Sequence, residues 1–86
     1  MTYEEYSRLD GVAMAALVRK GEVTPAELLE HAIARAEAVN TRLNAIVYKG
    51  YDDARKATAK IDRGAPFAGV PFLIKDLYCD VAGWPM

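Results

Sequence analysis

Lys75 is the residue whose type and place in the sequence point most directly to chemistry. It follows the apolar run Val70–Ile74, which has the length of a buried strand, and Asp76 comes next. Ligands bind at the carboxyl ends of strands in open α/β sheets, burial favours the neutral form of a lysine amine, and a neutral lysine can act as a base in nucleophilic catalysis. The same spacing also fits a solvated strand end or a Lys–Asp salt bridge, and these are the commoner uses of such a pair.

Serine, histidine and cysteine occur once each, as Ser7, His31 and Cys79. A Ser-His-Asp triad, or a zinc site built from several His and Cys ligands, therefore cannot be complete within these residues. We expect no metal site. We expect His31 to be an exposed residue on a helix surface. Cys79 is expected to be an inert, partly buried thiol, with a place in the wall of a pocket near Lys75 as the alternative.

Three helices and two strands must position these residues, according to the spacing of the apolar side chains. Asp10 can cap the first helix, and Thr24-Pro25-Ala26-Glu27 has the pattern of a capping box with proline at the first helical position. The helices are predicted at about residues 11–20, 25–40 and 51–63, and the strands at about 44–48 and 70–75. The order α, α, β, α, β indicates an α/β fold. Because so thin a sheet leaves one face of an apolar strand uncovered, we expect the first part of a larger α/β protein.

Composition and charge exclude several classes of function. The 86 residues are 52% apolar and 27% charged, with a formal net charge of −1, and they suffice for one small domain. Such a balance gives no basic surface for nucleic acid or for an anionic membrane. No apolar run has the length of a membrane span, and residues 1–10 lack the basic and apolar segments of a secretory signal. A single cysteine favours a reducing compartment, and we expect a cytoplasmic protein.

The run from Gly69 to Asp76, GVPFLIKD, resembles the lysine-bearing segment of the amidase signature family, and Pro66-Phe67-Ala68 precedes it as in that family. Gly21-Glu22-Val23-Thr24 before the long helix and Asn44-Ala45 after it also resemble the family's opening segments, in the expected order. The resemblance implies that residues 1–86 are the N-terminal part of a single amidase domain. They would contribute N-terminal helices and the first strands of a mixed-sheet α/β/α fold.

The resemblance also implies an activity. Family members are amide hydrolases with a Ser-cisSer-Lys triad, and Lys75 matches the triad lysine. By analogy, neutral Lys75 draws a proton through a bridging serine and activates a second serine, and the acyl-enzyme formed is then hydrolysed. No metal or cofactor is needed, and Asp76 orients the loop. Both serines lie downstream in family members, and Ser7, which precedes the first predicted helix, cannot replace them; the chain alone is therefore expected to be inactive.

The partner implied is a small-molecule amide, with no direct contact to nucleic acid and no membrane. Family members are often homodimers, and the oligomeric state of this chain stays open. Two alternatives remain at this point. One is a transamidating subunit of the same family, which acts on mischarged tRNA together with partner chains. The other is a small non-enzymatic module, in which the helices bind a partner and Lys75 has a structural role.

Overall fold

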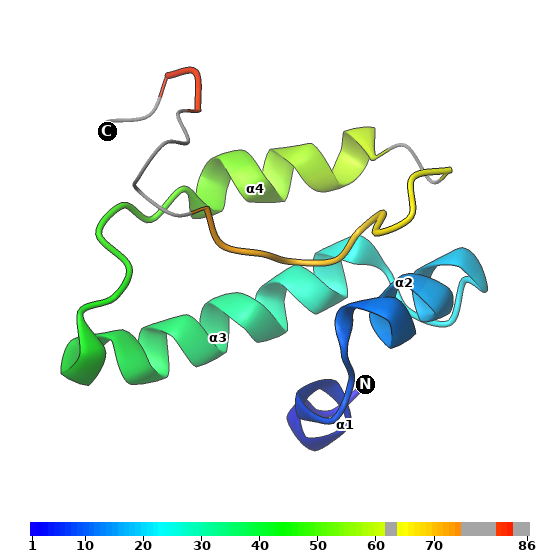
Figure 1. Ribbon diagram of the computed structural model, residues 1–86, viewed down its shortest axis with the longest axis horizontal. Coiled ribbons are helices and arrows are strands. Elements are labelled where there is room, and N and C mark those ends of the chain that lie inside the picture. Colours follow the sequence, from blue (N-terminus) through cyan, green and yellow to red (C-terminus); the bar gives the residue numbers. More distant parts are fainter. Residues whose placement is uncertain (62–63, 75–80, 84–86) are drawn as a thin grey trace.

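The computed structural model describes residues 1–61, 64–74 and 81–83, and in these residues the secondary structure is helical (Figure 1). The elements are α1 (Tyr3–Ser7), α2 (Gly11–Arg19), α3 (Pro25–Leu43) and α4 (Tyr51–Ala57), and α4 continues into a 3-10 turn, η1 (Thr58–Lys60). Helix α3 is the longest of the described helices, and the other elements contact it or lie beside it. Helices α1 and α2 lie at its N-terminal half, α4 runs along it, and residues 65–74 pass between α3 and α4 in Figure 1.

Side-chain caps fix the starts of α2 and α3, as the sequence predicts. The carboxylate of Asp10 accepts a hydrogen bond from the Ala13 N–H at 2.8 Å. The hydroxyl of Thr24 accepts one from the Glu27 N–H at 3.1 Å, and Pro25 occupies the first helical position. Each cap satisfies an N–H group that has no partner inside its helix, and contributes about 1 kcal/mol of helix stability. The observed α2 matches the predicted range 11–20 to within one residue.

The other helices differ from the prediction at their ends. Helix α1 is an additional element, held by a full capping box between Thr2 and Glu5. Helix α3 continues past residue 40 to Leu43 and ends where Asn44 takes a left-handed conformation with φ of 50°. The third predicted helix, over 51–63, ends at residue 57 as α-helix and at 60 as a 3-10 turn, and Ile61 is extended. Residues 62 and 63 lie outside the described residues.

The described residues contain no β-ladder, so the two strands expected at 44–48 and 70–75 are not seen as strands. A strand requires a neighbour to take its backbone hydrogen bonds. In the first segment a side chain takes that place: the amide of Asn40 donates to the Ile46 carbonyl at 3.1 Å and accepts from the Ile46 N–H at 2.9 Å. Residues 70–74 have no neighbouring strand in the described part of the chain, which alone therefore does not form the sheet of an α/β fold.

A small apolar core joins α2 to the start of α3. Leu28 has none of its surface exposed and Val18 has 1%, and they pack with Met14 and Val23. Ala68 is buried as well, which attaches the segment 65–70 to the same side of the helices. The fully buried side chains of the described residues thus lie where α2 meets the start of α3.

Candidate functional site

Lys75, the predicted catalytic residue, lies outside the described residues, as do Asp76 and Cys79. The structure does describe the chain that leads to Lys75. Residues 65–70 make two consecutive turns, in which the Ala68 N–H donates to the Ala65 carbonyl at 3.2 Å and the Val70 N–H to the Phe67 carbonyl at 3.1 Å. The described part of the candidate site therefore consists of the segment 65–74 and the helices that hold it.

Gly69 anchors this segment to the helical core. Its φ is +82°, and a β-carbon at this position would lie 2.9 Å from Cγ of Pro25 and 3.3 Å from Cγ1 of Val18. Only glycine combines the left-handed backbone with so close an approach. The guanidinium of Arg19 adds a hydrogen bond of 3.3 Å to the Pro66 carbonyl. The start of the apolar run is thus fixed against the C-terminal half of α2 and the first turn of α3.

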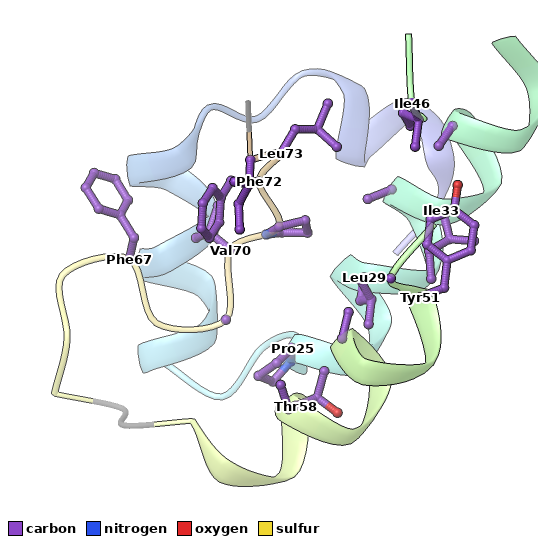
Figure 2. A pocket seen from close by; sticks show the side chains of 18 of the residues that line it. Pro25, Leu29, Ile33, Ile46, Tyr51, Thr58, Phe67, Val70, Phe72 and Leu73 are labelled. Atoms are coloured by element: carbon purple, nitrogen blue, oxygen red, sulfur yellow. The ribbon is translucent and has the colours of Figure 1, made fainter. Parts of the chain in front are cut away.

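An apolar hollow of about 890 Å³ opens between α3, α4 and residues 65–74 (Figure 2). Figure 2 shows side chains of α3, α4 and the segment 65–74 around this space. A second hollow of about 350 Å³ lies on the C-terminal half of α3 and shares Pro71, Phe72 and Leu73 with the first. In the described part of the chain no charged side chain lines the larger hollow, and its lining side chains are aliphatic or aromatic apart from that of Thr58.

Charged pairs at the surface hold α4 and the chain before it to α3. The guanidinium of Arg55 binds both carboxylate oxygens of Glu30, at 2.8 and 3.1 Å, and Lys49 binds Glu37 at 3.1 Å. A hydrogen bond from Arg55 lowers the pKa of Glu30, and one from Lys49 lowers that of Glu37. Burial is the main cause that raises the pKa of the Tyr51 hydroxyl beside the hollow. The charges thus support the arrangement of the helices without entering the hollow.

His31 takes part in packing and is not the exposed surface residue that the sequence suggested. It is half-buried, its ring stacks on Tyr6 with centroids 5.3 Å apart, and Nε2 lies 3.1 Å from the Met1 carbonyl oxygen. The Met1 ammonium pairs with the Glu27 carboxylate at 3.0 Å. No signal within α3 itself could have revealed these contacts, because both partners come from the first six residues.

The remaining candidates also have structural roles in the described residues. The hydroxyl of Ser7 is exposed and donates to the Glu4 carbonyl at 2.9 Å within α1. No group of three His, Cys, Asp or Glu side chains suited to a metal ion occurs among the described residues. The candidate site in the described residues is thus an apolar hollow, and the predicted base Lys75 lies outside them.

Comparison with known proteins identifies relatives of the chain. The family model described as Amidase matches residues 27–86. The chain is 53% identical over 78 residues to the protein named "Putative amidase AmiC" of Mycobacterium tuberculosis, a match that covers 90% of this chain and 16% of the relative. It is 46% identical over 68 residues to the 6-aminohexanoate-cyclic-dimer hydrolase of Paenarthrobacter ureafaciens, covering 79% of this chain and 13% of that protein.

The name of a third relative states an amidotransferase instead of an amidase or a hydrolase. It is one of the subunits of the glutamyl-tRNA(Gln) amidotransferase of Prochlorococcus marinus, 39% identical over 69 residues, covering 72% of this chain and 14% of the relative. No solved structure matches the chain. The chain thus spans 13–16% of the length of these curated relatives. Within the described residues, no helix has the length and apolar character needed to cross a membrane.

Proposed function

Since the chain belongs to the amidase family, we propose that it is part of an enzyme that hydrolyses carboxylic amides through a serine acyl-enzyme, with Lys75 as the base. The observation that carries the proposal is the family match over residues 27–86, because it includes the run Gly69–Asp76 in which Lys75 lies. The substrate is a small amide, and the site of action is the cytoplasm.

In the proposed mechanism, Lys75 begins as a neutral amine. It accepts the proton of a bridging serine while that serine takes the proton of the nucleophilic serine, whose oxygen then attacks the amide carbonyl. The leaving amine departs with a proton returned along the same path, and water hydrolyses the ester to the acid. Both serines lie outside residues 1–86, whose one serine, Ser7, bonds within α1.

The physical setting supports this role for the lysine. Val70–Ile74 is apolar, and an amine that follows such a segment into a protein interior loses hydration, which favours its neutral form. Gly69 holds the other end of the segment against Pro25. A base must be fixed within hydrogen-bond reach of its proton donor, and an anchored segment restricts where the lysine can lie.

The transamidating function is the second candidate. It is supported by the 39% identity with the amidotransferase relative of P. marinus. Two relatives whose names state amidase or hydrolase activity are more similar, at 53% and 46% identity. We therefore favour hydrolysis of small amides over amide transfer to an aminoacyl-tRNA.

The test is a chimera in which residues 1–86 replace the matching part of the M. tuberculosis relative. Release of ammonia from aliphatic and aromatic primary amides is measured for this chimera and for its Lys75→Ala variant. We expect the substitution to lower the rate by about 10²–10⁴-fold, the usual contribution of a general base. Lys60→Ala, which removes an exposed lysine from η1, is the matched control and should retain full activity.

Two further results bear on the proposal. The 86-residue chain alone should release no ammonia, because it lacks the serines. Full activity in the Lys75→Ala chimera would contradict the assignment of the base. A chimera that is inactive on small amides but amidates Glu-tRNA(Gln) would favour the second candidate.

A further inference from the structure

Arg19 joins the segment that leads to Lys75 to helix α2 by a polar contact. Nη1 of its guanidinium donates to the Pro66 carbonyl at 3.3 Å, across 47 positions of sequence. In the described part of the chain, the other hydrogen bonds of this segment are the two backbone turns that Ala68 and Val70 close. Among the described residues, Arg19 is therefore the side chain that holds the segment from outside by a hydrogen bond.

The two turns lie along α2, and the contacts on either side of them are apolar. At the start of α2, a β-carbon on Gly11 would lie 3.4 Å from Cε1 of Phe67, and Figure 2 shows Phe67 beside this helix. Near the end of α2, a β-carbon on Gly69 would lie 3.3 Å from Cγ1 of Val18. Apolar contacts are non-directional, whereas a hydrogen bond constrains the direction of the carbonyl that accepts it. The bond from Arg19 thus fixes how the turns are oriented on α2.

No ion pair within the described residues competes for the guanidinium of Arg19. The guanidinium of Arg55 on α4, by contrast, pairs with Glu30 and Asp52. A hydrogen bond with an ionised donor is stronger than one between neutral groups. Arg19 is also exposed at the last turn of α2, so replacing it removes the bond to Pro66 without opening a cavity in the core.

The position of the turns bears on the position of the amine. Pro66 lies nine positions before Lys75, and the apolar run Val70–Ile74 connects the turns to the lysine. A base must lie within hydrogen-bond reach of its proton donor, and a displacement of about 1 Å can cost about 10²-fold in rate. A change in the orientation of the turns is therefore expected to reach the reaction through the segment.

We propose that Arg19 is a positioning residue for Lys75. By binding the Pro66 carbonyl, it holds the turns before Val70 on α2 and so sets where the amine meets its proton donor. The inference rests on the proposed function, because it takes Lys75 as the base. Arg19 acts through the segment and takes no part in making or breaking bonds.

The test uses the chimera of residues 1–86 with the M. tuberculosis relative and measures ammonia release from primary amides as a function of pH. Arg19→Ala should lower kcat about 3–10-fold, the effect of losing one net hydrogen bond, and should change KM by less than about 2-fold. The acid limb of kcat/KM should move to higher pH by about 0.5 unit, because an amine held less firmly in the interior is better hydrated and its pKa is higher.

Lys20→Ala is the matched control. Lys20 is exposed beside Arg19 and carries the same charge, and no ion pair of the described residues includes it. Its kcat and pH profile should equal those of the unchanged chimera. Arg19→Lys should recover most of the lost activity, because only one nitrogen of the guanidinium binds the Pro66 carbonyl and an ammonium can supply that donor.

Amide hydrogen exchange gives a readout that does not depend on activity. The Val70 N–H donates to the Phe67 carbonyl at 3.1 Å and closes the second turn. If Arg19 holds the turns, exchange at Val70 in the chimera should be at least about 5-fold faster in Arg19→Ala than in Lys20→Ala.

Equal kcat and equal pH profiles in Arg19→Ala and Lys20→Ala would overturn the inference. So would an Arg19→Lys variant no more active than Arg19→Ala, or a lower kcat with an unmoved acid limb, which would assign Arg19 a purely structural role. Failure of the proposed function gives a different result, because the Lys75→Ala chimera then retains full activity. Exchange at Val70 still shows in that case whether Arg19 holds the turns.

Discussion

Replacing Gly69 by alanine is expected to destabilise the fold by about 2–5 kcal/mol, because two independent costs add at this position. The backbone has a φ of +82°, and an L-residue in the left-handed region costs about 1–2 kcal/mol. The new methyl group would lie 2.9 Å from Cγ of Pro25 and 3.3 Å from Cγ1 of Val18. The proline ring cannot rotate out of the way, and overpacking of this kind costs about 1–3 kcal/mol.

Gly21→Ala separates the two costs. Gly21 also has a positive φ, of +76°, but a β-carbon there would meet no atom within 4 Å. This control should therefore show the backbone cost alone, about 1–2 kcal/mol. The difference between the two variants is then the steric contact that attaches the segment 65–74 to the helices, about 1–3 kcal/mol.

Urea unfolding of the 86-residue chain, followed by circular dichroism, measures both free energies. In thermal unfolding, each kcal/mol corresponds to about 4–8 °C in a domain of this size. Equal destabilisation by Gly69→Ala and Gly21→Ala would refute the reasoning, since it would show that Gly69 does not lie against Pro25 in solution. If Gly69→Ala alone loses cooperative unfolding, its destabilisation exceeds that of Gly21→Ala, as expected.

Two other predictions concern the helices. Leu28→Ala should cost about 2–5 kcal/mol in urea unfolding because Leu28 is fully buried, whereas Leu43→Ala, at an exposed position, should change the stability by less than about 0.5 kcal/mol; similar values for both would contradict the core described above. Arg55 lowers the pKa of Glu30 from its ordinary value of 4.5. The stabilisation from this pair is therefore present above pH 4.5 and is lost as the pH falls through the lowered, folded-state pKa. Thermal unfolding on both sides of pH 4.5 should accordingly show a smaller acid-induced loss in Glu30→Gln than in the unchanged chain, and identical pH profiles would contradict the pairing.

Local signals predicted much of the helical structure. Asp10 and Thr24 each cap the helix that the sequence assigns to them, and α2 ends just before Gly21 as expected. Capping depends on residues three positions apart, so it can be seen in a short stretch of sequence. The same reasoning would have found α1, whose Thr2 and Glu5 have the spacing of a capping box.

Features that depend on distant residues could not be predicted in this way. The apolar run 44–48 has the composition of a strand, but Asn40 takes both backbone groups of Ile46. The partial burial of His31 depends on Tyr6 and on Met1, which is 30 positions away. A composition or periodicity signal contains no information about either contact. The residues 70–74 need a sheet edge that the described chain does not contain, so their sequence alone does not make them a strand.

One part of the candidate site, the motif, could be predicted from the sequence, and the other part, the hollow, could not. The motif around Lys75 can be seen in the sequence, and the role of this lysine stays a prediction because the residue lies outside the described part of the chain. The hollow has no sequence signature, because its lining comes from α3, α4 and two connecting segments. Gly69 shows how both kinds of information meet: it belongs to the motif, and the structure explains it by the contact with Pro25.

The way the core is distributed along the sequence sets an order of events in folding. Met14, Val18, Val23 and Leu28 lie within 15 consecutive positions, so this core closes only short loops. The contacts of residues 65–70 close much longer ones, as the Arg19–Pro66 hydrogen bond does across 47 positions. Closing a longer loop costs more chain entropy before any contact is gained. We therefore expect the α2–α3 pair to form first, and the segment that leads to Lys75 to take its place late in folding.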